Sequence, residues 1–172
     1  MNEPAKLGRI RRLAWVFILG LVISGVTAIP LAAEVNWLVH WTGARERVVA
    51  AGSTNPTAWA EWLLQTQTAL HDTSARHPIL YYGTDWLAFG HFAIALVFVG
   101  AVRDPVRNRW LFDFGLMACV LVIPYALIFG ALRGIPFWWR LIDGSFGVIG
   151  FVPLWFCRKW ACELERAKLI AG

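Results

Sequence analysis

Long runs of apolar residues dominate the pattern along this chain of 172 residues. Four of them predict membrane-spanning helices, at about 13–33, 84–102, 111–132 and 136–157. Each is close to the roughly 20 residues that an α-helix needs to cross the hydrocarbon core of a bilayer. The runs are apolar on every face, whereas the strands of a membrane barrel alternate over segments of about 10 residues. The predicted fold class is therefore all-α, a polytopic membrane protein with four transmembrane helices.

The composition supports this prediction. Hydrophobic residues make up 58% of the chain and charged residues 16%, and eleven residues are tryptophan. A soluble domain of this length could not bury so much apolar surface. We therefore expect residues 1–172 to form a single four-helix transmembrane domain.

Positive charges are concentrated at one end of the predicted helices. Eleven of the sixteen Lys and Arg residues precede the first span, lie between the second and third, or follow the fourth: Lys6, Arg9, Arg11, Arg12, Arg103, Arg107, Arg109, Arg158, Lys159, Arg166 and Lys168. The positive-inside rule places that end in the cytoplasm, so we expect an inner-membrane protein with both termini inside. The formal charge of +5 then reflects this bias and attraction to anionic membrane lipids rather than binding to nucleic acid.

The segment at about 34–82 is the largest piece outside the predicted spans, and its pattern indicates a further helix. An apolar stripe recurs there at a spacing of three and four residues: Trp59, Trp62, Leu63, Thr66 and Leu70. This spacing predicts an amphipathic interfacial helix at about 56–72. The helix is either a lid packed on the spans or a gate over an opening between them, and the lid is favoured because such helices are frequent in membrane folds.

Helix-breaking and capping residues set the expected boundaries of these elements. Pro30 is expected to kink the first helix before the apolar segment 31–41, and Pro78 and Gly83 to break the chain before the second span. The predicted amphipathic helix should start at Pro56, because proline suits a first helical position. Its candidate N-caps are Ser53, Thr54 and Asn55.

Ionisable residues inside the predicted spans are the candidate functional residues, because charges at membrane depth are kept only where something pairs with them. Arg140 and Asp143 lie about 6 and 10 Å along the fourth span, and His91 about 9 Å along the second, at 1.5 Å of rise per residue. The stripe of Gly144, Gly147 and Gly150 should let helix backbones pack closely, and so turn Arg140 and Asp143 toward the neighbouring helices. The candidate ligand-binding residues are Glu34, Asp85, His91, Tyr125, Arg133, Trp139, Arg140 and Asp143.

Two interpretations of this cluster stay open at the level of the sequence. In the first, Arg140 and Asp143 form an ion pair within their helix, completed by Asp85 or Glu34, which only fixes how the helices dock. In the second, the same residues form the polar floor of an aromatic-walled pocket in the outer half of the membrane.

Other charged and metal-binding patterns are weaker. His91 by itself is more often a hydrogen-bonded packing residue than a ligand, and a b-type haem would need His40 or His77 as a second axial ligand. Asp113 lies one helical turn beyond Arg109 and is expected to form a local pair with it. The sequence predicts no metal site and names no cofactor.

No motif in the chain names a reaction. The predicted function is binding of a lipid, a quinone or another amphipathic small molecule in the outer-half pocket, and catalysis on that molecule is left open. The alternative is an accessory or scaffold subunit whose Trp-rich surface docks a larger membrane protein complex or a second copy of the chain. A b-type haem protein is a minor alternative.

Overall fold

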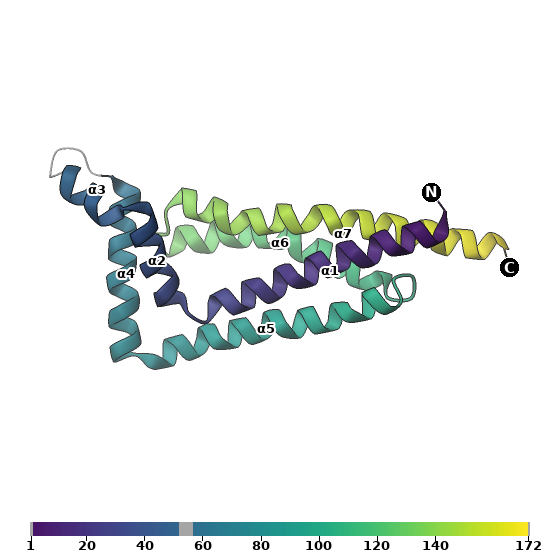
Figure 1. Ribbon diagram of the computed structural model, residues 1–172, viewed down its shortest axis with the longest axis horizontal. Coiled ribbons are helices and arrows are strands. Elements are labelled where there is room, and N and C mark those ends of the chain that lie inside the picture. The colour runs from purple at the N-terminus through teal and green to yellow at the C-terminus, as the bar shows by residue number, and fades with distance from the viewer. Residues whose placement is uncertain (1, 52–56, 172) are drawn as a thin grey trace. The chain divides into compact units, whose positions relative to one another are not determined.

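All the elements that the computed structural model describes, within residues 2–51 and 57–171, are α-helices (Figure 1). Four helices in these ranges are long and apolar enough to cross a membrane: α1 (Glu3–Ala28), α5 (Pro78–Arg103), α6 (Arg109–Leu132) and α7 (Phe137–Ala171). Three shorter helices lie between α1 and α5 in the chain: α2 (Leu31–Thr42), α3 (Ala44–Ala51) and α4 (Ala58–Arg76). The predicted all-α class with four membrane-spanning helices is confirmed at this level.

Prolines move two helix boundaries away from the predicted ones. α1 ends at Ala28 rather than at 33, because Pro30 has no N–H and disfavours helical geometry at the residue before it. α5 begins at Pro78 rather than at 84, since proline suits the first position of a helix. Gly83 lies inside α5, so the break expected there is wrong.

α7 continues well beyond residue 157, where the apolar run of the sequence ends. The buried side chains Leu154 and Cys157 are followed at helical spacing by Ala161 and Leu164, which are also buried. This apolar stripe keeps the charged last part of α7 packed on its neighbours, so the helix does not stop at the predicted boundary.

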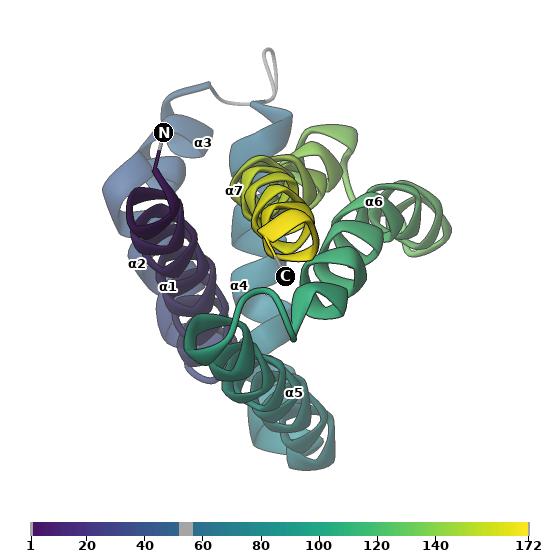
Figure 2. The ribbon, with the colours of Figure 1, turned by 90° about the vertical axis from the view of Figure 1, so that its right-hand side faces the viewer.

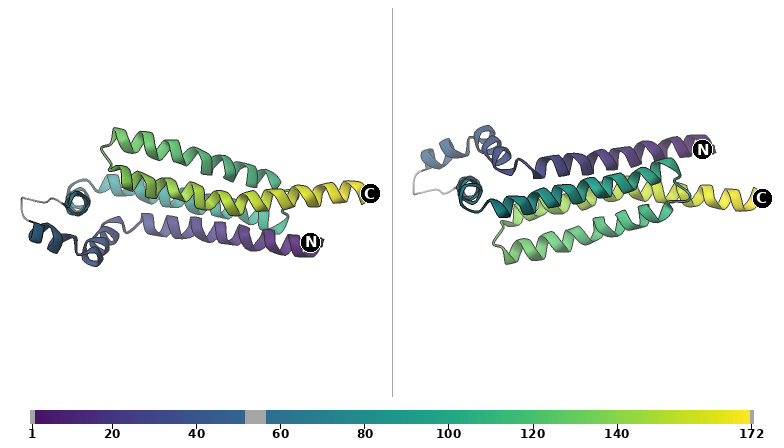
Figure 3. Two further views of the ribbon diagram at one scale, coloured as in Figure 1. Left: turned by 90° about the horizontal axis from the view of Figure 1, so that it is seen from above. Right: turned by 90° about the horizontal axis from the view of Figure 1, so that it is seen from below.

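The chain divides into two compact units. Unit 1 comprises Met1–Leu21 with Ile94–Gly172, and unit 2 comprises Val22–Ala93. In unit 1, α6 and α7 run antiparallel and lie side by side (Figures 1 and 3). Both the start of α1 and the end of α7 lie at the end of unit 1 that faces the viewer in Figure 2. Near that end the four helices share a core of fully buried side chains: Ile10, Phe98, Leu111, Phe112, Leu154 and Cys157.

A glycine in the left-handed conformation makes the turn that brings α7 back along α6. Gly134 has φ +69°, and its N–H donates to the carbonyl of Ala131 at 3.1 Å. The N–H of Ile135 donates to the carbonyl of Gly130 at 2.8 Å. This is the hydrogen-bond pattern of a Schellman motif, which ends α6 and satisfies its last carbonyls.

Close contact between α6 and α7 depends on positions that lack a side chain. A Cβ added at Gly147 would lie 2.3 Å from the carbonyl oxygen of Cys119, and one added at Gly150 would lie 3.0 Å from the Cys119 Sγ. The predicted packing role of these two glycines is therefore confirmed. The same role predicted for Gly144 is wrong, because a Cβ there would meet nothing within 4 Å.

In unit 2, the apolar stripe of α4 packs against α2 and α3. Leu63 is buried, and Trp59, Trp62 and Leu70 pack around a core that includes Val35 of α2. These three helices form a small cluster with its own hydrophobic core. α4 continues to Arg76 rather than ending at 72, and the predicted caps and start of the helix, residues 53–56, lie outside the described residues.

Gly147 and Gly144 provide a matched test of the contact between α6 and α7. We expect Gly147→Ala to lower the free energy of unfolding by about 1–3 kcal/mol, because the added carbon overpacks against the α6 backbone. Gly144→Ala should be neutral or slightly stabilising, since alanine is the better helix former and no atom opposes it. Thermal unfolding in detergent, followed by circular dichroism, measures both variants, and equal effects would contradict the packing role of Gly147.

Candidate functional site

The candidate residues fall into two groups, one in each unit. Those in unit 2 are Glu34, Asp85 and His91. Those in unit 1 are Tyr125, Arg133, Trp139, Arg140 and Asp143.

Asp85 lies on one face of α5 beside aromatic side chains. It lines a shallow groove of about 260 Å³ together with Tyr82, Trp86 and Phe89. The Trp86 ring meets those of Tyr82 and Phe89 edge to face, at centroid distances of 6.0 and 5.7 Å. The groove is open and all of its lining residues belong to one helix.

Glu34 lies in a different groove, on α2. The groove is lined by Ala33, Glu34, Trp37 and Leu38. Glu34 is half-buried, and burial raises the pKa of its carboxyl group. The structure therefore does not bring Glu34 and Asp85 into one groove.

The ring of His91 is bound to its own helix. Its Nδ1 donates to the carbonyl of Leu87 at 2.8 Å. This contact fits the interpretation of His91 as a hydrogen-bonded helix residue. Within the described ranges, no cluster of three or more His, Cys, Asp or Glu residues could hold a metal ion.

Arg140, on the first turn of α7, lies in a slot on α6 that a glycine provides. A Cβ added at Gly130 would lie 2.5 Å from both Cγ and Cδ of Arg140, so the arginine chain crosses α6 at this position. Arg140 Nη1 donates to the carbonyl of Leu127 at 3.2 Å, and its guanidinium lies 5.3 Å from the centroid of the Phe137 ring. Arg140 Nε is buried and has no hydrogen-bond partner among the described residues.

The ion pair between Arg140 and Asp143 that the first interpretation requires is not formed. In the part of the chain that the structure describes, there are three ion pairs, and neither residue takes part in them. The Arg140 side chain extends instead across α6 to the Leu127 carbonyl, and Asp143 is half-buried one turn further along α7. The ion pair of the first interpretation is therefore wrong, whereas Arg140 does contact α6, as a role in docking the two helices requires.

The other candidates in unit 1 surround the same hairpin. Arg133 caps the end of α6 and is exposed, and Trp139 is half-buried on the first turn of α7. Tyr125 lies on α6 and is exposed, with its ring 4.4 Å from the ring of Phe129. The α6–α7 hairpin thus carries two cations, one acid and several aromatic rings near its turn.

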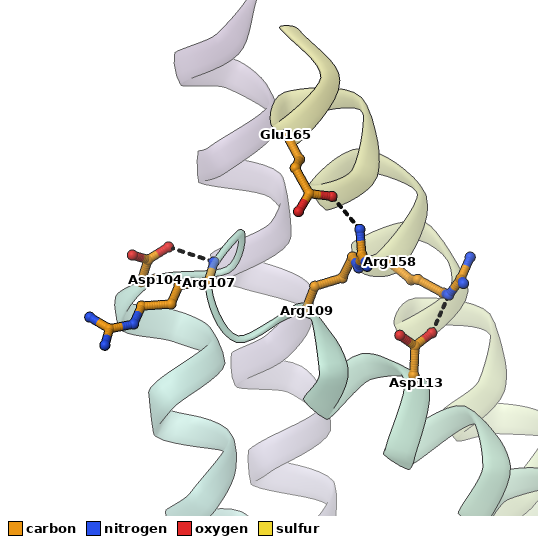
Figure 4. Close-up of polar contacts among 6 residues, drawn as sticks. All are labelled: Asp104, Arg107, Arg109, Asp113, Arg158 and Glu165. Carbon is orange, nitrogen blue, oxygen red and sulfur yellow. Dashed lines mark hydrogen bonds and ion pairs between the residues drawn. The ribbon is translucent and has the colours of Figure 1, made fainter. Parts of the chain in front are cut away.

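Ion pairs hold the helices together at the opposite end of unit 1 (Figure 4). Arg109 of α6 pairs with Glu165 of α7, and Asp113 of α6 pairs with Arg158 of α7. The local pair expected between Arg109 and Asp113 is therefore wrong, because each finds a partner on the facing helix. Lys6 of α1 also pairs with α7, through Glu163 at 2.6 Å.

Three further polar contacts lie at the end of α5 or in the loop that follows it. Arg11 Nε donates to the carbonyl of Val102 at 3.1 Å, so α1 satisfies a carbonyl in the last turn of α5. Asp104 accepts a hydrogen bond from the Arg107 N–H at 3.0 Å, and Asn108 Nδ2 donates to the carbonyl of Gly100 at 2.9 Å. Arg11, which in the sequence analysis serves only to orient the chain, thus also joins α1 to α5.

A polar chain in unit 2 was not anticipated from the sequence. Arg45 donates to Gln67 at 3.1 Å, Gln67 donates to Asn36 at 2.8 Å, and His71 Nε2 lies 3.0 Å from the same Asn36 oxygen. These contacts join α2, α3 and α4 on one side of their apolar core. The signals in the sequence were the polar Asn36 inside an apolar run and the one-turn spacing of Gln67 and His71.

A double-mutant cycle tests the contribution of the Asp113–Arg158 pair. Both side chains are more than a third exposed, so we expect a coupling energy of only about 0.2–1 kcal/mol between Asp113→Asn and Arg158→Gln. Thermal unfolding of the two single variants and the double variant gives the coupling. Raising the salt concentration should reduce it, and a value well above this range would contradict a solvent-screened pair.

No protein-family model matches this chain, and no curated protein or solved structure matches it. What the protein does is therefore inferred from its own residues. Among the candidates, Arg140 has the most specific surroundings. Its half-buried side chain lies against Gly130, bonds to the Leu127 carbonyl and faces the Phe137 ring.

Proposed function

We propose that this chain is an inner-membrane protein that binds the oxygen-bearing head of an amphipathic small molecule, such as a lipid or a quinone, at the α6–α7 hairpin. The observation that carries the proposal is Arg140, a half-buried cation in a membrane-spanning helix that has no acidic partner among the described residues. An unpaired charge at membrane depth is costly, so a charged residue there usually marks a functional site.

The hydrogen-bonding capacity of Arg140 supports an oxygen-rich ligand. A guanidinium has five N–H donors, and the bond to the Leu127 carbonyl occupies one of them, on Nη1. The planar donor fork suits a phosphate or carboxylate, and single donors suit a quinone carbonyl. Phe137 and Gly130 hold the guanidinium in place, which lowers the entropy that binding would cost.

The rest of the hairpin fits the same kind of ligand. Arg140 is the fourth residue of α7 and so lies about 5 Å from the helix start, within reach of the head of an amphipathic ligand. Arg133 adds a second positive charge at the turn, while Tyr125 and Trp139 offer aromatic surface for the apolar part of a ligand. Asp143 would favour a ligand that carries a hydroxyl or another hydrogen-bond donor in addition to the oxygens that accept from Arg140.

We also propose that both termini are cytoplasmic and that the hairpin and the α2–α4 cluster lie on the outer side of the inner membrane. The support is the positive-inside bias of the eleven Lys and Arg residues at the other ends of the spans. In this topology α2, α3 and α4 form a helical cluster at the outer surface, with the exposed Trp37 and Trp41 at the membrane interface.

Ligand binding is tested by identifying what copurifies with the protein in mild detergent. We expect mass spectrometry to find a defined lipid or quinone with the wild type, and Arg140→Gln to lose at least about 10-fold of it, since charge-assisted bonds contribute roughly 1.5–3 kcal/mol. Gly130→Ala should have a similar effect, because the added carbon pushes Arg140 out of its slot. Gly144→Ala is the matched control and should retain the ligand.

Three results would count against this function. If Arg140→Gln and Gly130→Ala keep the ligand, then Arg140 does not bind it. If both variants keep the ligand but unfold at lower temperature, Arg140 only docks α7 on α6. If the wild type copurifies with a stoichiometric membrane protein and with no defined small molecule, the role of accessory or scaffold subunit is favoured.

The topology is tested by labelling single cysteines in intact cells. In a variant in which the three native cysteines are replaced by serine, we expect a membrane-impermeant maleimide to label Arg76→Cys on α4 and not Lys168→Cys on α7. Lysis should then expose Lys168→Cys to the reagent. The reverse labelling pattern would show that the termini face outward.

A further inference from the structure

A groove on α7 lies at the end of unit 1 that holds the three ion pairs. It has a volume of about 280 Å³ and is lined by Trp155, Arg158, Lys159, Cys162, Glu163 and Arg166. Its lining side chains bear three positive charges and one negative charge. The groove lies far along α7 from Arg140, and the function proposed above does not use it.

Ion pairs with neighbouring helices hold the two flanks of this groove. On one flank Arg158 pairs with Asp113 of α6, as Figure 4 shows, and on the other Glu163 pairs with Lys6 of α1. Lys159 and Arg166 form no ion pair among the described residues, and both are exposed. The groove therefore holds two cations outside these ion pairs, between side chains that the ion pairs position.

The outward face of α7 continues from these cations into an apolar track. The residues of this face follow one another at a spacing of four and three: Val148, Val152, Trp155, Lys159, Cys162 and Arg166. Val148 and Val152 are 58% and 52% exposed, so the described side chains of unit 1 leave the track uncovered. The opposite face of the helix, with Leu154, Cys157 and Leu164, is buried in unit 1.

The order of groups along this face matches the order of groups in a phospholipid. The apolar track suits an acyl chain, and Trp155, whose ring stacks on Phe151 at 5.9 Å between centroids, marks the interface. Lys159 follows one turn beyond Trp155, about 6 Å along the axis, where a lipid phosphate lies. Basic pockets at such a depth recognise anionic head groups.

We infer that this groove binds an anionic phospholipid, with its phosphate between Lys159 and Arg166 and an acyl chain along Val148 and Val152. Charge complementarity and the adjoining apolar track together favour a lipid over free phosphate. Because Arg158 is already paired with Asp113, its side chain forms part of the wall of the groove. Lys159 and Arg166 then provide the electrostatic attraction for the lipid phosphate.

Native mass spectrometry of the full chain in detergent tests this site with dioctanoyl phosphatidylglycerol as the probe. We expect wild type to bind it in preference to dioctanoyl phosphatidylcholine, and the double variant Lys159→Gln/Arg166→Gln to lose roughly 10- to 30-fold in affinity. The double variant Arg9→Gln/Arg12→Gln removes the same charge from α1 and should lose less than about 3-fold. Lys159→Arg/Arg166→Lys keeps both charges and should bind as wild type does.

Two controls distinguish a lipid site on α7 from a free-phosphate site and from the hairpin. Glycerol phosphate without acyl chains should not compete at millimolar concentration, and equal binding of it would mean a phosphate site instead of a lipid site. The loss caused by Lys159→Gln/Arg166→Gln should be the same in an Arg140→Gln background as in the wild type, so failure of the hairpin proposal does not affect this one. Equal losses in both glutamine variants, or no selectivity over phosphatidylcholine, would overturn the inference.

Discussion

The close approach of α6 and α7 is the contact on which the rest of unit 1 depends. It is possible because Gly147 leaves room for the α6 backbone at Cys119, and because Gly134 adopts a left-handed conformation that turns the chain. In a bilayer, helices are not driven together by the hydrophobic effect, since lipid tails are as apolar as leucine. Close packing at small residues therefore provides much of the association.

The close contact between α6 and α7 also decides which charged side chains form pairs. At the end with both termini, it brings Asp113 and Arg109 of α6 against Arg158 and Glu165 of α7, so four charges cancel in two pairs. At the hairpin end, it places Arg140 over Gly130 and next to a carbonyl, and among the described residues no acid pairs with it. One end of the α6–α7 pair is thus joined by ion pairs, and the other by a hydrogen bond from Arg140 to a backbone carbonyl.

In unit 2 the helices α2, α3 and α4 are held together in a different way, by a small hydrophobic core of their own. The apolar stripe of α4 is covered by α2 and α3, and a polar chain through Asn36 and Gln67 runs beside that core. An apolar core gives such a cluster its stability, and directional hydrogen bonds fix which helix faces meet. The tryptophans Trp59 and Trp62 therefore serve packing within unit 2.

The sequence by itself determined the all-α class, the four long apolar helices and the existence of α4. These follow from the length and periodicity of apolar runs, which depend only on local geometry and on the bilayer thickness. It also determined that Arg140 is unusual, because a charge within an apolar run is visible without any partner. The short α3 and the extension of α7 past residue 157 were not predictable, since both depend on apolar contacts with other helices.

Only the tertiary structure decided the partners of the charges. Asp113 could pair with Arg109 on its own helix or with a residue of α7. It pairs with Arg158 because α6 and α7 lie close enough for the two side chains to meet. Arg140 could pair with Asp143 one turn away, but the missing side chain of Gly130 opened a route to the Leu127 carbonyl. A sequence names the charged groups, whereas the contact between helices fixes which of them lie within hydrogen-bonding distance.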